Sequence, residues 1–279
     1  MTDFIHISAH SERGEKMPNY VTNRVVMTGE QSQIDELVRA VQFPDEGLGS
    51  VEFSKVIPMP PELDIPEGTD TQNGFKLYSD FVEVYKIGLG NRPFDPMDIP
   101  ARAENAFLNY RRGISDRVWT LGRAAYRNNE KYGFKTWLDW RIKMWNTNSE
   151  GRRFEPFSDN TLCFETAWSR ASPIVEQLSR MYPDVTFQYS WADEDFGNNV
   201  GEVELQNGEI TYENIPAPFS KEAFEMAADI RGEDLLADRH MMFNEESDNY
   251  EYLSDEEIED LTEGEISDSG ENEQPQQSM

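Results

Sequence analysis

Residues 160–192, "NTLCFETAWSRASPIVEQLSRMYPDVTFQYSWA", carry three successive secondary-structure signals. Bulky and small or polar residues alternate from Leu162 to Trp168, as they do on the two faces of a β-strand. Ser172 and Pro173 then supply the capping hydroxyl and the first-turn proline that are typical of a helix start. Alternation returns from Val185 to Trp191. The stretch therefore predicts a strand, a helix and a second strand.

The segments on either side extend this pattern into a sheet. Residues 201–215 read as a hairpin around Asn207 and Gly208, a strong two-residue turn signal. Residues 20–29 read as a strand, 30–43 as a helix, and 50–57 as a strand that Pro58 ends, because proline cannot donate to a ladder. Two β-α-β halves predict an α+β, ferredoxin-like antiparallel sheet with helices on one face.

A helical insertion is predicted between the two halves, at about residues 98–150. Apolar residues recur every three or four positions from Ala103 to Ala125, which indicates one long amphipathic helix. A second helix is expected over 131–145, with three tryptophans on an inward arc that also holds Arg141. We interpret these tryptophans as core residues. Residues 61–97 are rich in Pro, Gly and Asp, and they are expected to be mostly irregular.

Charge divides the chain further. The formal net charge is −29, yet residues 102–153 carry twelve basic and five acidic residues. Residues 244–279 carry acidic residues and no Lys or Arg. We expect a flexible N-terminal arm at 1–16, a domain at 17–243 that ends in a helix from about Ser220, and a disordered acidic tail at 244–279. The chain shows neither a signal peptide nor a long apolar run, so the expected location is the cytoplasm.

Several stretches resemble one known family. They are "MPNYVTNRVVMTG" (17–29), "FSKVIPMP" (53–60), "WLDWRIKMWNTN" (137–148), "LCFETAWSRASPIVEQLSRMYPDVTF" (162–187) and "YSWADEDFGNNVGEVEL" (189–205). Together they are similar to the phage- and plasmid-borne Api-like family, which is named for a ferredoxin-like domain and largely lacks an assigned function. The resemblance implies an accessory protein of a mobile element and supports the fold, but it supplies no reaction.

The residues offer no recognisable catalytic or cofactor chemistry. His6, His10 and His240 have no Cys or acidic neighbour at a metal-ligand spacing, so no metal is expected. Cys163 falls in a predicted strand and is expected to be a small buried hydrophobe. No glycine-rich phosphate loop follows a strand. We therefore expect a protein that is not an enzyme and needs no cofactor.

Acidic residues are the main candidates for partner binding. A two-residue turn would place Leu205 opposite Ile210, Val203 opposite Tyr212 and Glu202 opposite Glu213, creating a stripe of like charges that costs up to about 1 kcal/mol. The tail adds apolar residues to its acids and could fold into a partner groove or imitate a DNA backbone. The full candidate set is Asp193, Glu194, Asp195, Glu202, Glu204, Glu209, Glu213, Glu256, Glu257, Ile258 and Leu261.

The function that these observations favour is a non-enzymatic accessory protein that binds, and inhibits, a basic host protein such as a nucleic-acid-handling defence factor. An alternative is nucleic-acid binding through the basic helical block 102–153, for which the candidates are Arg111, Arg112, Arg117, Arg123, Arg127, Lys131 and Lys135. A second alternative is an enzyme of unknown reaction, for which Arg141 and Glu165 would have to share a deep polar pocket.

Overall fold

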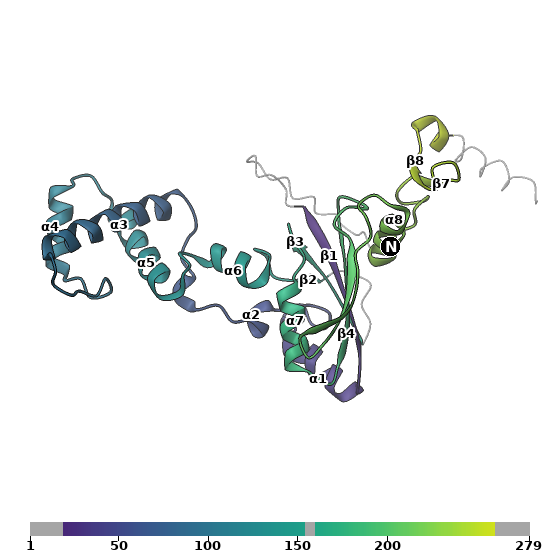
Figure 1. Ribbon diagram of the computed structural model, residues 1–279, viewed down its shortest axis with the longest axis horizontal. Coiled ribbons are helices and arrows are strands. Elements are labelled where there is room, and N and C mark those ends of the chain that lie inside the picture. The colour runs from purple at the N-terminus through teal and green to yellow at the C-terminus, as the bar shows by residue number, and fades with distance from the viewer. Residues whose placement is uncertain (1–18, 154–159, 260–279) are drawn as a thin grey trace, which may run out of the picture.

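The computed structural model describes residues 19–153 and 160–259, and it is built around a six-stranded sheet (Figure 1). The strand order is β2-β3-β1-β4-β5-β6, and every neighbouring pair is antiparallel. The strands are β1 (Tyr20–Thr28), β2 (Arg152–Arg153), β3 (Thr161–Ala167), β4 (Thr186–Asp193), β5 (Gly201–Gln206) and β6 (Glu209–Asn214). The predicted fold class is confirmed.

The strand-helix-strand prediction for residues 160–192 is also confirmed. The helix α7 (Ser172–Met181) joins β3 to β4, and β1 lies between these two strands. In β1, Val25 stands opposite Leu162 of β3 and opposite Tyr189 of β4. Two parallel strands with one antiparallel strand between them form the split β-α-β unit of ferredoxin-like folds.

The main core lies on one face of the sheet, beneath α1 (Gln31–Val41) and α7. Alternate residues of β1 point toward it, and Val21, Val25 and Met27 are at most 1% exposed. Asn23 belongs to the same inward row and is also fully buried. Alternate residues of β1 therefore point into the core, and one of them, Asn23, is polar.

The strand predicted for residues 50–57 is wrong. Only an isolated bridge between Val51 and Gly151 forms there, and the short helix α2 (Phe53–Val56) follows it. Phe53 and Val56 are three residues apart, so one helical turn buries both side chains. The backbone N–H of Phe53 donates to the Glu150 carboxylate at 2.7 Å instead of joining a ladder.

The helical insertion is longer than predicted. It comprises η1 (Pro61–Leu63), α3 (Thr69–Leu89), α4 (Ala101–Tyr110), α5 (Asp116–Tyr132) and α6 (Trp137–Trp145). The helix α3 occupies a segment expected to be irregular. The expected single helix from Ala103 to Ala125 is two helices, because Gly113 adopts a φ of +91° and the Ser115 side chain caps α5.

Residues 68–135 form a helical arm that projects from the sheet (Figure 1). The arm has its own core of aromatic and aliphatic side chains, centred on Tyr78, Phe81 and Trp119. Its two longest helices cross at Gly74 of α3 and Gly122 of α5, where a Cβ added to Gly74 would lie 2.1 Å from the Val118 carbonyl oxygen. Glycine is therefore required for this close approach.

The second face of the sheet is covered by α8 (Lys221–Arg231), so helices lie on both faces and not on one as expected. Arg24 of β1 pairs with Asp229, and Arg231 donates to the Thr22 hydroxyl at 3.1 Å. The chain continues into a hairpin of β7 (Met241–Asn244) and β8 (Asn249–Tyr252).

The predicted disordered tail therefore begins too early. Met241 is 1% exposed and packs with Phe224 of α8 in a separate small core, which gives the hairpin an apolar anchor. The predicted arm 1–16 and residues 260–279 of the tail lie outside the described residues. None of the helices within 19–153 and 160–259 combines the length and apolar character needed to cross a membrane.

Candidate functional site

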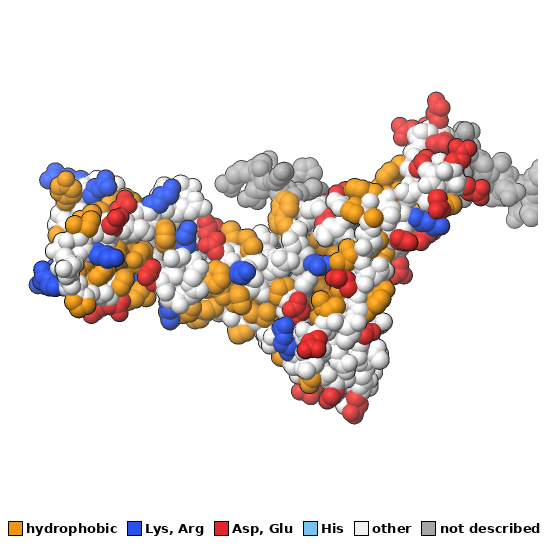
Figure 2. Space-filling model, viewed as in Figure 1, with side chains coloured by type: hydrophobic (Ala, Val, Ile, Leu, Met, Phe, Trp, Pro, Cys, Tyr) orange, Lys and Arg blue, Asp and Glu red, His pale blue; other side chains and the backbone are white. Residues whose placement is uncertain are grey.

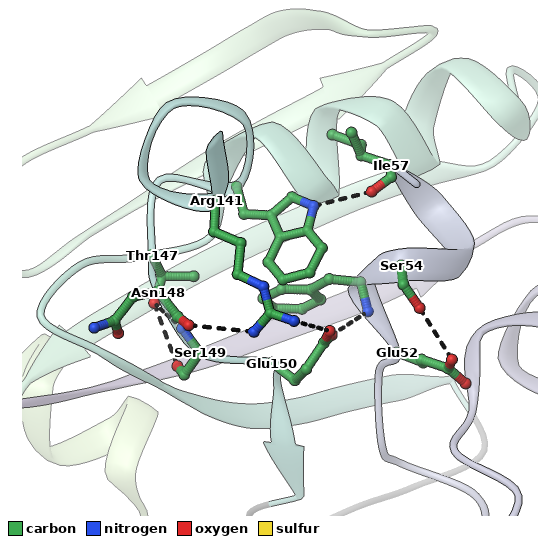
Figure 3. Close-up of polar contacts among 10 residues, drawn as sticks. Glu52, Ser54, Ile57, Arg141, Thr147, Asn148, Ser149 and Glu150 are labelled. Atoms are coloured by element: carbon green, nitrogen blue, oxygen red, sulfur yellow. Dashed lines mark hydrogen bonds and ion pairs between the residues drawn. The ribbon is translucent and has the colours of Figure 1, made fainter. Parts of the chain in front are cut away.

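Two of the three tryptophans of α6 are core residues, as predicted, and the third, Trp137, is half-buried. Trp140 is 5% exposed and Trp145 is fully buried, and the two rings meet edge to face. The Trp145 indole N–H donates to the Ile57 carbonyl at 3.0 Å, so its one polar group is satisfied inside the core (Figure 3). This segment joins the helical arm to the sheet and forms no open cleft around these two rings.

Arg141 serves the same junction. Its guanidinium lies 4.5 Å from the Trp145 ring centroid and 5.2 Å from that of Trp137. It also reaches Glu150 at 3.6 Å, where the carboxylate accepts the Phe53 N–H (Figure 3). Burial raises the pKa of Glu150, against the opposing effects of that N–H and of Arg141. Arg141 and Glu150 thus form a half-buried ion pair that links α6 to the start of α2.

Glu165 is not brought to this ion pair. Its neighbour Phe164 packs edge to face with Phe53 in the core, so Glu165 points to the opposite face of β3. The polar pocket that the enzyme hypothesis required, with Arg141 and Glu165 together, is therefore not formed by these two residues. Cys163 is fully buried, as expected, and burial raises the pKa of its thiol to about 11.

The acidic turn after β4 organises its own loop. Asp193 is 6% exposed and accepts hydrogen bonds from the side chains of Asn19 and Asn199 and from the Asp195 N–H. Glu194 accepts the Tyr20 N–H at 2.8 Å. No group of acids, His or Cys in the described residues has the arrangement of a metal site. Asp193 and Glu194 are therefore largely occupied by the chain itself.

The hairpin glutamates do not form the predicted stripe. The turn at Asn207 and Gly208 is confirmed, and Leu205 does stand opposite Ile210. The register then shifts, because Glu204 pairs with Tyr212 and leaves Thr211 as an extra residue.

The shift relieves the expected repulsion. Glu202 stands opposite Asn214, whose amide donates to it at 3.4 Å, and Glu204 accepts the Thr211 hydroxyl at 2.7 Å. Glu209 stands opposite Gln206. Glu213 stands opposite the buried Val203 and therefore lies on the other face of the sheet from Glu202. Glu202, Glu204 and Glu209 therefore share one face of the hairpin without standing directly opposite one another, and Glu213 is separated from them.

The basic residues of the arm are largely engaged within it. Arg117 pairs with Asp70, Lys131 with Glu62, and Arg123 with the 5%-exposed Glu104. Arg127 donates to the Met97 carbonyl at 3.2 Å, and Lys135 lies 4.5 Å above the Phe75 ring. Arg111 and Arg112 are exposed at the end of α4. Among the described residues, Arg111 and Arg112 are thus the two candidates whose side chains have no partner, whereas Arg117 and Lys131 are exposed within their ion pairs.

An acidic lobe is the strongest charged surface. We use this name for residues 220–259, which comprise α8, the hairpin β7–β8 and the turn that follows. Residues 221–259 carry fourteen acidic and three basic residues, a net charge of −11. Figure 2 shows the acidic side chains gathered on this end of the molecule.

The three bases of the lobe have partners inside it. Arg231 and Arg239 both pair with Glu233, and Lys221 lies 4.3 Å above the Phe243 ring. Burial tends to raise the pKa of Glu233, but the hydrogen bonds from the two arginines outweigh it and the pKa is lowered. The remaining carboxylates of the lobe outnumber its bases, although Asp229 pairs with Arg24 of β1 and Glu251 and Glu257 accept hydrogen bonds within the lobe.

A groove crosses the lobe between α8 and the hairpin. Its volume is about 440 Å³. Leu235, Met242 and Phe243 contribute apolar surface to it, and Glu225 and Asp234 contribute carboxylates. Sequence reasoning missed the groove because it assigned residues beyond 243 to a disordered tail. The apolar residues 241–243 and the alternation over 250–252 were the available signals of two strands.

The tail candidates lie at the edge of this lobe. Glu257 accepts hydrogen bonds from the Ser254 N–H and hydroxyl, at 2.8 Å and 2.7 Å, and so closes a helical turn. Glu256 is exposed and Ile258 is half-buried. Leu261 lies outside the described residues.

The match to one family model supports the fold. Residues 144–233 match the model of the ferredoxin-like domain in Api92-like protein. The crystal structure of Api92 from Yersinia pseudotuberculosis matches 72% of this chain and 100% of its own length, with 13% identity and a TM-score of 0.34. No curated protein sequence matches the chain. The matched range holds β3 to α8, whereas the hairpin of the acidic lobe lies beyond it.

Proposed function

We propose that this protein is a non-enzymatic accessory protein of a phage or plasmid, which binds and inhibits a basic host protein through the acidic lobe. The observation that carries this proposal is the combination of an apolar groove and surrounding carboxylates that the lobe's own bases do not neutralise. A nucleic-acid-handling defence factor is a suitable target class, because its binding channel is rich in Lys and Arg.

The two parts of the lobe have different tasks in this proposal. Apolar side chains such as Met242 and Phe243 would receive the apolar face of a partner segment and supply most of the affinity. The carboxylates would attract the partner's cations from a distance and fix its orientation, which mainly raises the association rate. The partner segment that fits is therefore amphipathic and basic.

The test is a capture experiment on host lysate with the full chain, followed by affinity measurements on the captured protein at several salt concentrations. A lobe variant carries Glu222→Gln, Glu225→Gln and Glu246→Gln, three exposed positions. A matched control carries Glu36→Gln, Asp45→Asn and Asp184→Asn, which remove the same charge from exposed positions outside the lobe.

We expect the lobe variant to bind at least about tenfold more weakly, about 1.4 kcal/mol, and with a shallower dependence on salt. The control should bind as the unmodified chain does. Equal weakening by both triplets would assign the effect to total charge and would contradict a specific lobe site.

The same proteins test the alternative function, which is nucleic-acid binding through the arm. Gel-shift titrations with single- and double-stranded DNA and RNA should show no complex at physiological salt. A complex that is lost on Arg111→Gln and Arg112→Gln, and not on changes in the lobe, would favour the arm as the binding surface.

A further inference from the structure

A second, smaller pocket lies at the end of the sheet where the loops after α6, β3 and β4 meet. Its volume is about 350 Å³. The residues that line it are Asn146, Ser169, Arg170, Trp191, Asn199, Val200 and Ile215. All seven belong to residues 144–233, the range that matches the ferredoxin-like family model, and none belongs to the acidic lobe.

Arg170 is the unusual residue of this pocket. Its guanidinium lies 3.6 Å from the ring centroid of Trp191, a side chain that is 1% exposed. Among the described residues, no carboxylate forms an ion pair with Arg170 and no acceptor takes a hydrogen bond from its side chain. Glu213 and Glu176 act on it only through longer-range attraction, and burial is the largest effect on its pKa, which is lowered.

Among the described residues, most of the other half-buried arginines pair with a carboxylate, whereas Arg127 donates to the Met97 carbonyl instead. Arg141 has Glu150, Arg123 has Glu104, and Arg231 has Glu233. An arginine remains charged in a protein, and a partly desolvated guanidinium without an anion is costly. Its planar fork of N–H donors is suited to a carboxylate or a phosphate, which it can bind through two parallel hydrogen bonds.

The backbone that carries Arg170 is held rigidly. Ala167 is fixed at both polar groups, because its N–H donates to Ser149 at 2.9 Å and its carbonyl accepts from Thr147 at 2.8 Å. The Ser169 carbonyl accepts from Thr166 at 2.8 Å, and the Arg170 carbonyl accepts from Asn146 at 2.9 Å.

Strain accompanies this rigidity. Trp168, a bulky residue that is 49% exposed, has a φ of +69°, a region that such residues rarely adopt. The pocket residues Asn146 and Asn199 also have positive φ values, of 63° and 47°. Unfavourable backbone conformations that the surrounding contacts enforce are typical of ligand sites, because they hold a side chain ready for binding.

We propose that this pocket binds a small molecule that carries an oxyanion, a carboxylate or a phosphate, with Arg170 as its anchor. Ser169 and Asn146 supply further polar groups at the anion, and Val200 and Ile215 form an apolar wall for the body of the ligand. The volume is at the lower end of the range for small-molecule sites, which suits a ligand of metabolite size.

Phenyl phosphate, benzoate and phenol are the probes, because they share a ring and differ in the anion. Binding to the full chain is followed by calorimetry and by tryptophan fluorescence, to which Trp191 contributes. We expect saturable binding of at least one of the two anions at millimolar concentration and none of phenol. Phosphate and carboxylate ligands are distinguished by which anion binds more tightly.

The variants are Arg170→Gln, Arg170→Lys and Ile215→Glu, with Arg39→Gln as the control because that arginine is exposed and pairs only with Asp35. Arg170→Gln should weaken binding at least about tenfold, and Arg170→Lys should weaken it to a lesser extent because it retains the charge but loses the fork. Ile215→Glu places a negative charge at a 54%-exposed wall position and should abolish binding without disturbing the core.

Absence of binding by both anions, or equal binding by Arg170→Gln and the unmodified chain, would overturn the proposal. The result is independent of the proposed partner interaction, because the pocket and the acidic lobe share no residue and each is tested by its own variants.

Discussion

Single buried polar residues specify the interior of this protein. Asn23 stands in the inward row of β1 among aliphatic side chains, yet its side-chain amide uses both its donor and its acceptor atoms in hydrogen bonds. Its amide donates to the Val21 carbonyl and to the Thr166 hydroxyl, both at 2.9 Å. Its carbonyl accepts the Tyr189 hydroxyl at 2.6 Å and the Ala171 N–H at 3.2 Å. One side chain thus connects three strands and the start of α7.

We predict that Asn23→Ala lowers the free energy of unfolding by about 3 kcal/mol, because the buried Tyr189 hydroxyl and Ala171 N–H lose their acceptor. Tyr189→Phe should cost only about 1 kcal/mol, since it removes a donor and leaves Asn23 its other partners. Urea denaturation of the three proteins measures the difference. Equal losses for the two variants would show that the connection through Asn23 is not the source of the effect.

The helices and strands show what sequence patterns can and cannot specify. The prediction for 160–192 succeeded because alternation and two prolines indicated the same boundaries. The expected cap is wrong, because Ala171 is the N-cap of α7 and no side chain donates or accepts a capping hydrogen bond there. The helix α3 was missed although Tyr78, Phe81, Val82 and Tyr85 follow a helical period, because the prolines on both sides dominated the interpretation.

Two other errors have a different cause. The extra residue at Thr211 depends on its side chain reaching Glu204, a tertiary choice that alternation does not encode. Residues 50–57 contain β-branched residues, but the edge of the sheet beside β3 is held by β2, and Val51 only forms a bridge to the residue that precedes β2. The pocket around Arg170 could not be predicted, because it combines residues 146 to 215 from four separate segments.

The crossing of α3 and α5 gives a prediction with an internal control. Gly74→Ala should lower the free energy of unfolding by about 3 kcal/mol, because the new Cβ would collide with the Val118 carbonyl and separate the helices. Gly88→Ala lies in the same helix with open space around it, and it should raise stability by about 0.5 to 1 kcal/mol.

Both variants are measured by thermal and urea unfolding, with far-ultraviolet circular dichroism as the signal. The two substitutions are chemically identical, so helix propensity cannot explain opposite signs. A stabilising Gly74→Ala would show that the helices cross at a greater distance than the structure gives.

The whole molecule combines three separate cores with one dominant sign of charge. The cores lie under α1 and α7, in the helical arm, and between α8 and the hairpin. A formal charge of −29 acts across all of them. Self-repulsion of this kind weakens a compact state and is reduced by salt.

We therefore predict that the thermal midpoint rises by several degrees between about 20 mM and 300 mM NaCl, as the screening length falls below the spacing of the surface carboxylates. The triple Gln variant of the acidic lobe carries less charge and should show a smaller rise. A midpoint that falls with salt would indicate that the ion pairs of the arm and lobe outweigh the repulsion.

The way the arm is attached has a consequence for how such a chain can change over time. Its hydrophobic interior is drawn from within residues 78–126, and its two stems meet where the Thr136 hydroxyl donates to Glu67 at 2.7 Å. The chain therefore enters and leaves the arm at neighbouring points, and a short peptide could join residues 67 and 136 if the arm were removed. Recombination could exchange this appendage for another while the sheet, with its loops, is inherited intact.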